Sequence, residues 1–566
     1  MYVLGLSALE HDSSAALVSE QGIVAAMEES KLLRVAASGG IPHAAIRFCL
    51  DRAGIEWRDL DAVAVASRPL HAWAREAWLR ARRSPFAPVA GAYFLTKAFG
   101  ELGRELNNFR ALKVMDGSSR ARILNLEHHL CHAASAFYAS PFDRAVILTL
   151  DEQGDGWSSV AALGEGTRIR ILRSCSFPDS VGWLYSQVTA LLGFQPRREE
   201  HKTQWLSLEG EPAFEKVFED ILGRPSRGLP RLDLSYFKPS LVGATAFSDK
   251  FFRRLGFESE DRFQLTDALR RQLAASLQQA CARVLVACAE DLCRETGVQN
   301  VCLAGGVFLN ALLVTALEKS VGLNQVFAQP AAGNTGCALG SAWLTWHQVL
   351  GKPRLDPMST LHWGPRYSTD EIKYVLDNCK ARYRWFDTEA QRIEATRQAL
   401  EQGEIVAWHQ GAVEFGPRAL GNRSILASPW TPYIKENLNH YVKHREPFRP
   451  FAIAVPEEDC SRYFECSRLV RFMATLGWVR PETRDLVKDF VLPGDQIRLY
   501  AVDRKTNPLL WQLLKEWGKR SPAPFLVNTS FNLFGEPLVV TPRDAVRSFF
   551  CSGIDALLIG GFFLSK

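Results

Sequence analysis

The sequence has no pair of cysteines in CxxC spacing, although twelve cysteines are spread over its 566 residues. Structural zinc sites and disulfide-based folds both depend on closely and regularly spaced cysteines, so the spacing favours neither class. We expect most of these cysteines to be small buried apolar residues in a reducing compartment.

Long apolar runs and a strong charge imbalance are also missing. No stretch approaches the roughly 20 apolar residues that cross a bilayer, and the N-terminal sequence MYVLGLSALEHDSS lacks the basic region of a signal peptide. A net charge of +5 is small for this length. It allows an anionic substrate such as a nucleotide without requiring a nucleic acid. We therefore expect a soluble, cytoplasmic protein without membrane or nucleic-acid partners.

What is present is a regular alternation of strand-like and helical segments, which predicts an α/β fold. The length exceeds what one core fills, and the proline-containing stretch 351–368 interrupts the alternation, so we predict two domains, 1–355 and 365–566. A segment rich in arginine and tryptophan, at about 68–123, predicts a helical insert that is either solvated or covers a substrate entrance. The clearest predicted strands are 3–8, 23–27, 62–67, 121–126, 145–151 and 300–306, and the longest predicted helix covers 265–297.

Two histidines and an aspartate indicate a metal site in the first half. The segment LEHHLCHAASAFYAS (126–140) predicts a helix, and at about 100° per residue His128 and His132 share one face, opposite an apolar stripe. Two histidines four residues apart on one face can bind the same metal ion. Asp151 ends the next predicted strand, where α/β folds place ligands. The alternative is that both histidines lie on the surface and Asp151 caps a turn.

Three polar turns, each following a predicted strand, indicate a nucleotide site in the same half. They are HDSSAAL (11–17), DEQGDGWSS (151–159) and LAGGVFLN (303–310). Glycines let the backbone approach a phosphate closely, and backbone N–H groups at the start of a helix attract anions. Each turn alone is weak, because such turns are mostly structural. Together they resemble the nucleotide cleft of the actin-like and sugar-kinase fold.

Arginines in loops bounded by glycine and proline mark the second half. Arg418 and Arg423 lie in AVEFGPRALGNRSILASP, Arg449 follows in HREPFRPFAIAV, and Arg498 precedes a strand-like run. The segment NTSFNLFGEP (528–537) adds amide and hydroxyl side chains. Arginine matches phosphate oxygens, and amides can hydrogen-bond to an NH2 group, so the set suits a small phosphorylated amide. The alternative is a set of surface arginines in ordinary ion pairs.

These motifs together resemble the NodU/CmcH carbamoyltransferase family, essentially from end to end. The resemblance rests on EHDSSAAL, EHHLCHAASAFY, TLDEQGDG, LAGGVFLN, ALGSAW, EFGPRALGNRSIL, REPFRPFAIAV and NTSFN. It implies an actin-like N-terminal domain similar to the tRNA threonylcarbamoyltransferase and a YrdC-like C-terminal domain. The implied reaction takes carbamate from carbamoyl phosphate, activates it with ATP as carbamoyl adenylate, and transfers the carbamoyl group to a hydroxyl of a small molecule, such as an antibiotic or polyketide.

The resemblance also assigns roles to residues of this sequence. His11 is implied as the general base that acts on the acceptor hydroxyl. The implied ATP-binding residues, which would hold the nucleotide with Mg²⁺, are Asp12, Ser13, Gly154, Asp155, Gly306 and Asn310. The implied carbamoyl phosphate-binding residues are Arg418, Arg449, Arg498, Asn528, Ser530 and Asn532. One bound metal ion, expected to be Fe²⁺, has the implied ligands His128, His132 and Asp151.

Several positions depart from the family pattern. Asn334 stands where the family often has an aspartate that completes the metal shell, and its amide oxygen can still bind a hard cation but carries no charge. In EESKLLRVAAS the chain keeps Arg34 but lacks the lysines that usually follow it, and HKTQWLSLEG replaces the usual YKVMGLAPYG. These differences leave the acceptor open, and a homodimer is also left open.

Two other functions compete with this interpretation. A tRNA threonylcarbamoyl-type transferase would need a more basic surface, for which the insert with Arg68 and Arg83 is the one candidate. A non-catalytic nucleotide sensor of the actin-like fold would have no use for the arginine clusters of the second half. A hydrogenase-maturation carbamoyltransferase would carry the CxxC pairs that this sequence lacks.

Overall fold

The computed structural model of the chain describes residues 1–8, 11–36, 38–67, 103, 112, 121–223, 225, 228–238, 246–322 and 325–566. The chain forms two compact units. The first consists of Met1–Val24 and Gly39–Pro357, and the second of Ala25–Ser38 and Met358–Lys566. Most of the predicted insert at 68–123 lies outside the described residues. Within them, no helix is both long and apolar enough to cross a membrane.

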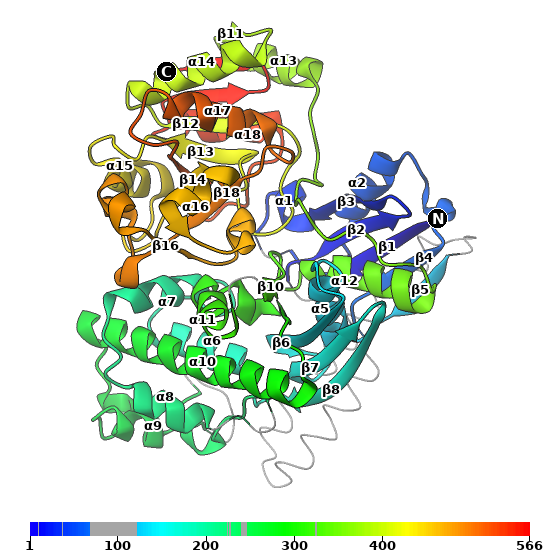
Figure 1. Cartoon of the computed structure of the whole chain (residues 1–566), viewed down its shortest axis with the longest axis vertical. Helices are drawn as coiled ribbons and strands as arrows, with labels where there is room; N and C mark the ends of the chain where they lie inside the picture. Colours follow the sequence, from blue (N-terminus) through cyan, green and yellow to red (C-terminus); the bar gives the residue numbers. More distant parts are fainter. Residues whose placement is uncertain are drawn as a thin grey trace. The chain divides into compact units, whose positions relative to one another are not determined.

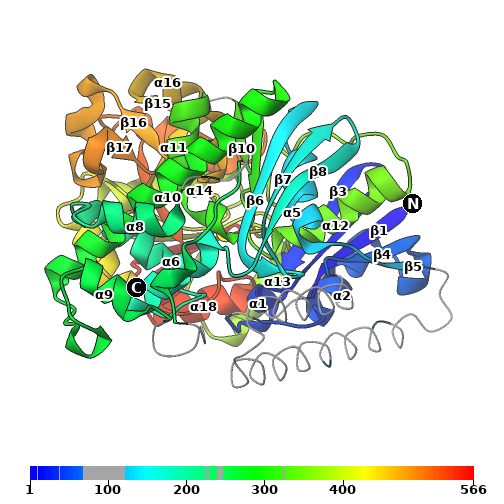
Figure 2. The same cartoon turned by 90° about the horizontal axis from the view of Figure 1, so that it is seen from below.

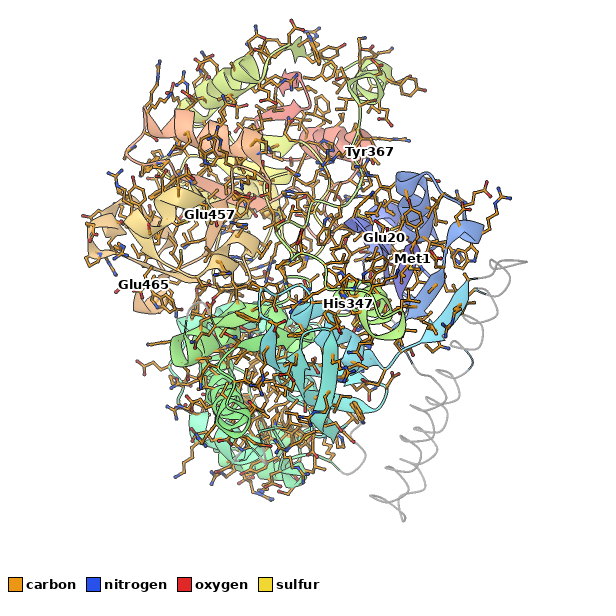
Figure 3. The ribbon with its side chains drawn as sticks, turned by 45° about the vertical axis from the view of Figure 1, so that its right-hand side comes forward. Met1, Glu20, His347, Tyr367, Glu457 and Glu465 are labelled. Carbon is orange, nitrogen blue, oxygen red and sulfur yellow. The ribbon has the colours of Figure 1, made fainter. Side chains whose placement is uncertain are left out.

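The first unit contains two sheets with the same strand order, β3-β2-β1-β4-β5 and β8-β7-β6-β9-β10. In each, the central strand pairs antiparallel with one neighbour and parallel with the other, so β1 and β6 occupy equivalent places. Met1 and Glu20 lie together at one end of the β1–β2 pair (Figure 3). The strands are β1 (Tyr2–Ser7), β2 (Ser14–Ser19), β3 (Gly22–Glu28), β4 (Ala62–Val65), β5 (Arg122–Asn125), β6 (Arg144–Gly154), β7 (Trp157–Glu165), β8 (Arg168–Ser176), β9 (Val301–Ala304) and β10 (Val326–Ala328).

Helices α5 (His128–Phe137) and α12 (Gly336–Leu344) pack against each other, with α12 on β1 and β2 and α5 on β6 (Figures 1 and 2). Glycines permit the close packing. A Cβ at Gly5 would lie 2.0 Å from the carbonyl oxygen of Ala338, and one at Gly340 would lie 1.8 Å from that of Cys131. Side chains at these points would push the layers apart. The helices therefore hold the carboxyl ends of β1 and β6 in fixed places.

The remaining helices of the first unit lie on the outer side of these layers or in the connection between β8 and β9. The longest, α10 (Asp267–Thr296), ends at Gly297, whose φ of 67° is the left-handed conformation of a helix end. This confirms the helix predicted at 265–297. The others are α2 (His43–Ala53), α6 (Val181–Leu191), α7 (Glu200–Leu206), α8 (Glu215–Leu222), α9 (Asp249–Arg254) and α11 (Ala311–Val321).

The second unit is built on a mixed sheet of eight strands in the order β11-β21-β20-β12-β13-β19-β14-β18. Its apolar side chains form one buried core that includes Ile425, Val455 and Val527. The strands are β11 (Arg384–Trp385), β12 (Val406–His409), β13 (Arg423–Ala427), β14 (Ala452–Pro456), β18 (Leu499–Val502), β19 (Leu526–Ser530), β20 (Ala556–Ile559) and β21 (Phe562–Ser565). The α/β fold expected from the alternation is thus confirmed in both units, with mixed sheets.

Helices and a small second sheet complete this unit. Helices α14, α17 and α18 pack on the large sheet, and Glu457 and Glu465 lie in the part around α16 and β15 (Figures 1 and 3). The small sheet has β15 (Phe464–Glu465), β16 (Gly477–Val479) and β17 (Gln496–Ile497). The helices are α1 (Glu29–Leu33), α13 (Thr369–Asn378), α14 (Glu389–Glu401), α15 (Ile434–Asn437), α16 (Cys460–Tyr463), α17 (Pro508–Gly518) and α18 (Pro542–Phe550).

Helix α5 is enclosed on more sides than its single apolar stripe indicates. The sequence predicted His128 and His132 on the face opposite that stripe as metal ligands, with surface histidines as the alternative. In the structure His128, His129 and His132 are all buried, because α5 packs against β6, β9 and α12. A helix enclosed by other elements has no solvent face, which a single apolar stripe cannot reveal. The histidines are therefore interior groups.

Candidate functional site

Three side chains predicted as metal ligands come together at the start of α5 and the end of β6. The carboxylate Oδ2 of Asp151 lies 3.0 Å from Nε2 of His132 and 3.6 Å from Nε2 of His128. The two imidazole rings are 4.6 Å apart. Atoms bound to one ion at about 2.1 Å lie roughly 3.0–3.4 Å apart. The distance from Asp151 to His132 falls in this range and the distance to His128 is slightly longer, so a small movement would let the three side chains share one ion.

The electrostatics of this group also fit a cation. Both ring nitrogens of His128 are buried and have no hydrogen-bond partner among the described residues. Burial raises the pKa of Asp151, but its contacts with His128 and His132 hold that pKa well below the ordinary value, so the group is a carboxylate. Burial, followed by the charge of His128, lowers the pKa of His132 and favours the neutral imidazole that a metal requires.

Two glycines expected to approach a phosphate have another role in this geometry. A Cβ at Gly154 would lie 2.0 Å from Cδ2 of His128, and one at Gly306 would lie 3.1 Å from Oδ1 of Asp151. The absence of side chains at both positions leaves room for the two ligands. The role of these glycines in nucleotide binding stays a prediction.

Two carboxylates cap the first turn of α5. Glu127 accepts hydrogen bonds from the N–H groups of His129 and Leu130, and Asp155 accepts one of 2.9 Å from the N–H of His128. These contacts satisfy N–H groups that a helix start leaves open. Asp155, predicted as an ATP-binding residue, therefore fixes the backbone of a metal-ligand candidate.

Cys337 is a candidate that the sequence analysis missed. Its Sγ lies 3.4 Å from Nδ1 of His132, and His128, His132 and Cys337 form a buried group able to hold a metal ion. A histidine that ligates through Nε2 usually donates its other ring N–H to a fixed partner, and here the sulphur occupies that place. Asn334 lies one turn earlier, where its carbonyl oxygen accepts the N–H of Cys337. The role of Asn334 as a metal ligand stays a prediction.

His11 lies in the loop after β1 and forms a pair with the next residue. Its Nδ1 is 2.9 Å from Oδ2 of Asp12, and Asp12 adopts a φ of 60°. This contact raises the pKa of His11, against the effect of burial, and the charge of Asp151 raises it further. Asp12, predicted to bind ATP, therefore orients the predicted base. Ser13 is buried in the same loop.

Asn310 has a structural part in this geometry. Its Oδ1 caps α11 by accepting the N–H groups of Leu312 and Leu313, and its Nδ2 donates to Gln278 at 2.8 Å and to Tyr185 at 3.4 Å. These bonds use the hydrogen-bonding capacity of the amide. The nucleotide contact of Asn310 stays a prediction.

In the second unit, cationic side chains from three separate segments lie close together. Burial, and then the neighbouring charge of Arg449, lowers the pKa of Arg418 to about 10. The same two causes lower the pKa of Arg445 to about 9. Burial and the charges of Arg418, Arg445 and Arg449 together hold the pKa of Arg498 well below its ordinary value. Such mutual repulsion is relieved by an anion.

Lys443 belongs to this group, although the sequence analysis did not select it. It is buried, and burial and the charges of Arg445 and Arg449 hold its pKa well below its ordinary value. Its Nζ donates to carbonyl oxygens of Ser530 and Asn532 and, at 2.6 Å, to Oδ1 of Asn532. The only signal in the sequence was its place two residues before the REPFRPF motif. Together with Arg418, Arg445, Arg449 and Arg498 it forms what we call the cationic cluster.

Asn528 adds a hydrogen-bond acceptor beside the cationic cluster, whose own side chains are donors. Its Nδ2 donates to the carbonyl oxygen of Ala419 at 3.1 Å, whereas its Oδ1 is buried without a partner in the described part of the chain. A buried unpaired acceptor is costly unless a ligand donates to it. Ala419 follows Arg418 directly, so this amide lies beside the loop that carries the first arginine of the cluster.

Arg423 does not join the cationic cluster. It is fully buried and donates to the carbonyl oxygens of Gln410, Gly411 and Asn422. Oε1 of Glu414 accepts the N–H groups of Leu420, Asn422 and Arg423. These contacts of Arg423 and Glu414 fix the conformation of the loop that carries Arg418.

The comparisons with known sequences identify the family of the chain. The family described as "Carbamoyltransferase N-terminus" matches residues 2–343, and the family described as "Carbamoyltransferase C-terminus" matches residues 397–566. The chain belongs to the carbamoyltransferase family. It is a transferase enzyme, and the resemblance found in the sequence motifs is confirmed.

Similar proteins span most or part of this carbamoyltransferase. An uncharacterized Synechocystis protein is 33% identical over all of this chain and 97% of its own length. Nodulation protein NolNO of Sinorhizobium fredii is 32% identical over 98% of this chain and 79% of its own. The 3'-hydroxymethylcephem-O-carbamoyltransferase of Amycolatopsis lactamdurans is 30% identical over 46% of this chain and 47% of its own. The crystal structure of T. kodakarensis HypF, at a TM-score of 0.38 and 14% identity over 63% of this chain and 49% of that chain, is too distant to decide the fold of either unit.

Proposed function

We propose that this carbamoyltransferase moves the carbamoyl group of carbamoyl phosphate to a hydroxyl group of a small molecule and consumes ATP. O-carbamoyl transfer is supported by the similarity to the cephem O-carbamoyltransferase. The use of carbamoyl phosphate is supported by the cationic cluster with the unpaired Oδ1 of Asn528 beside it. This last observation carries the proposal most directly.

The chemistry of carbamoyl phosphate matches that arrangement. Its phosphate group would be bound by guanidinium groups of Arg418, Arg449 and Arg498, which present paired donors to phosphate oxygens. Its NH2 group would donate to the buried Oδ1 of Asn528. Lys443, Ser530 and Asn532 form one connected set of hydrogen bonds along the edge of the cluster. Cleavage of the carbamoyl phosphate by water yields phosphate and carbamate.

The first unit would carry out the two later steps. Carbamate attacks the α-phosphate of ATP to form carbamoyl adenylate and pyrophosphate, and the acceptor hydroxyl then displaces AMP and loses its proton. We propose His11 as the base that takes this proton, with Asp12 holding its imidazole. The repeated five-stranded sheets support an actin-like nucleotide-binding domain over 1–355, and we propose a YrdC-like domain over 365–566.

A metal ion at His128, His132 and Asp151 would supply positive charge next to the phosphates of ATP. The ring nitrogens of His128, which have no hydrogen-bond partner among the described residues, and the approach of His128 and His132 to Asp151 support such an ion. The family resemblance implies Fe²⁺, although imidazole and carboxylate ligands also suit Zn²⁺. The ion itself must be identified by elemental analysis.

The test is to supply ATP, carbamoyl phosphate and a panel of hydroxyl compounds and to follow phosphate, pyrophosphate, AMP and carbamoylated product by mass. We expect phosphate release to need no ATP and product to need both substrates. Asn528→Ala should stop phosphate release and leave ATP binding intact, whereas the exposed Arg468→Ala serves as the control. Release of phosphate by Asn528→Ala at the wild-type rate would contradict the proposed pocket. A threonylcarbamoyl product on tRNA would instead favour the rival transferase.

A further inference from the structure

The short segment Glu28–Arg34 lies within Ala25–Ser38, which belongs to the second unit, although the chain before Ala25 and after Ser38 builds the first unit. It consists of the end of β3 and the five-residue helix α1, followed by Arg34 in a left-handed conformation with φ 59°. A helix this short is not stable by itself. Its side-chain contacts must therefore hold it, and they reach two loops of the second unit.

One end of the segment fixes the loop before Arg418. Nζ of Lys31 is buried and donates to the carbonyl oxygens of Glu414 at 2.6 Å and Gly416 at 2.7 Å. It also pairs with Oε1 of Glu28 at 2.9 Å, and the same Oε1 accepts the N–H of Gly416. Gly416 is therefore held through both its carbonyl and its amide, two residues before the arginine of the cluster.

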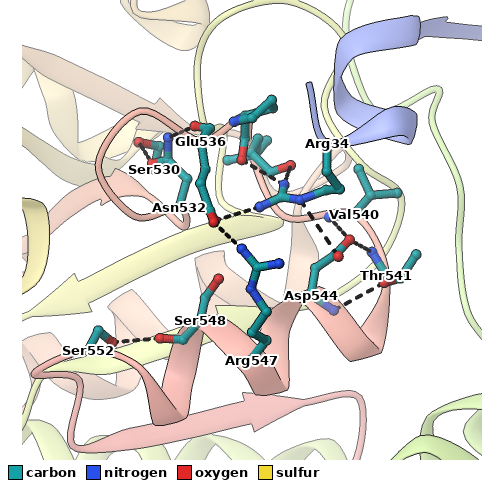
Figure 4. Close-up of polar contacts among 12 residues, drawn as sticks. Arg34, Ser530, Asn532, Glu536, Val540, Thr541, Asp544, Arg547, Ser548 and Ser552 are labelled. Carbon is teal, nitrogen blue, oxygen red and sulfur yellow. Dashed lines mark hydrogen bonds and ion pairs between the residues drawn. The ribbon is translucent and has the colours of Figure 1, made fainter. Parts of the chain in front are cut away.

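The other end of the segment fixes the loop after Asn532 (Figure 4). Nη1 of Arg34 donates to the carbonyl oxygens of Pro537 and Leu538, both at 2.7 Å, and Nη2 donates to Oε2 of Glu536 at 2.9 Å. Its Nε lies 3.6 Å from Oδ1 of Asp544. A planar guanidinium can serve these separate acceptors at once, whereas a lysine has a single nitrogen.

Hydrogen bonds lead from this loop to the cationic cluster. The carbonyl oxygen of Glu536 accepts a bond of 2.7 Å from Nδ2 of Asn532, whose Oδ1 binds Nζ of Lys443 at 2.6 Å. Arg34 thus reaches the cluster through Glu536 and Asn532, and Lys31 reaches it through Gly416. Arg547 also pairs with Glu536, but it is exposed and lies on the far side of that carboxylate (Figure 4).

We propose that the segment Glu28–Arg34 is a positioning clamp, which holds the loop of Arg418 and the loop of Asn532 at the spacing that anion binding requires. Arg34 and Lys31 are positioning residues: each acts on the anion only through a loop. The inference rests on the proposed function, because the anion is the phosphate group of carbamoyl phosphate. It adds that residues near the N-terminus determine how tightly this pocket binds phosphate.

The experiment compares Arg34→Gln and Arg34→Lys with Arg547→Gln in the full-length protein. Three quantities are measured: the Kd of inorganic phosphate by calorimetry, KM and kcat for phosphate release from carbamoyl phosphate, and pyrophosphate release from ATP with added ammonium carbamate. We expect Arg34→Gln to raise the Kd and KM about five- to tenfold, with a smaller rise for Arg34→Lys. Arg547→Gln should change neither, and pyrophosphate release should stay at the wild-type rate in all three variants.

A purely structural Arg34 would lower the melting temperature and leave the Kd and KM unchanged, and that result would overturn the clamp. Equal effects of Arg34→Gln and Arg547→Gln would overturn it too. If Arg34→Gln does not fold, Arg34→Lys and Glu536→Gln give the same comparison. Failure of the proposed function looks different: the wild-type protein would release no phosphate from carbamoyl phosphate, and Arg418→Ala would not weaken phosphate binding.

Discussion

The two candidate sites concentrate charge of opposite sign. Around Asp151 the first unit gathers the acidic side chains of Asp12, Glu127 and Asp155 near three histidines, with burial raising the pKa of Glu127 to about 7, whereas the second unit gathers four arginines and a lysine. In both places burial makes like charges costly. In the first unit the histidines and backbone N–H groups offset the charge, whereas burial, and after it mutual repulsion, keeps the pKa values of Arg418, Arg445, Arg498 and Lys443 lowered.

The difference indicates what each site is built to accept. A group of carboxylates and imidazoles gains stability from a cation, and a nucleotide would enter such a place as a complex with metal ions. A group of guanidinium ions gains stability from a bare anion. The proposed division of one reaction between the two sites rests on this contrast, and each prediction below tests one side of it.

The largest expected effect falls on the first site alone. His11→Asn should lower formation of carbamoylated product about 100- to 10,000-fold, because it removes the proposed base, and should leave phosphate release from carbamoyl phosphate intact. Phosphate, pyrophosphate and product are measured side by side. Equal loss of all three signals in a folded variant would show that the two sites do not divide the reaction as proposed.

The next effect falls on the second site. Arg418→Ala should weaken phosphate binding by about 1.5–3 kcal/mol, which is roughly ten- to hundredfold in Kd, because a charge-assisted hydrogen bond to the anion is lost. Calorimetry with inorganic phosphate gives the Kd, and Arg468→Ala is the exposed control. ATP binding should not change. An unchanged Kd for phosphate would show that Arg418 does not bind the anion.

A third variant tests the proposed metal site of the first unit without replacing His128, His132 or Asp151, the proposed ligands. Cys337→Ser should lower metal affinity about ten- to hundredfold, because the sulphur beside Nδ1 of His132 orients that ring. Elemental analysis after dialysis against a chelator gives the content, with His132→Ala as the reference without metal. Cys281→Ser, another buried thiol, is the matched control. A loss shared by both serine variants would indicate general destabilisation.

The smallest expected effect is a shift in pH dependence. His11 acts as a base only when neutral, and Asp12 raises its pKa, so product formation should rise with pH through that raised value. Asp12→Asn should lower the pKa of His11 and move the rising limb to lower pH, even if the maximal rate falls. The charges of Asp151 and Arg197 also act on His11 and stay unchanged in this variant. If the rising limb of the pH profile does not move, Asp12 does not set the pKa of the proposed base.

Much of the molecule could be predicted from the sequence, because local patterns determined it. The alternation of apolar and polar residues gave strands and helices close to those observed, including the end of α10 at Gly297. Motifs such as GPRALGNRS and REPFRPF identified the family, which the profile matches confirm. The predicted metal ligands His128, His132 and Asp151 do converge, since a helix and the end of the next strand bring them together.

Only the tertiary structure decided which side chains serve each site and why. Cys337 and Lys443 reach their sites through packing between segments about 200 and 90 residues apart, which no local spacing encodes. Gly154 is small because the ring of His128 fills the space above it, and α5 has no solvent face because three elements enclose it. The placement of Glu28–Arg34 in the second unit depends on contacts with loops about 400 and 500 residues away. Such contacts form only once the chain is folded. The sequence therefore determined the helices, strands and motifs, and the tertiary structure determined which side chains meet at each site.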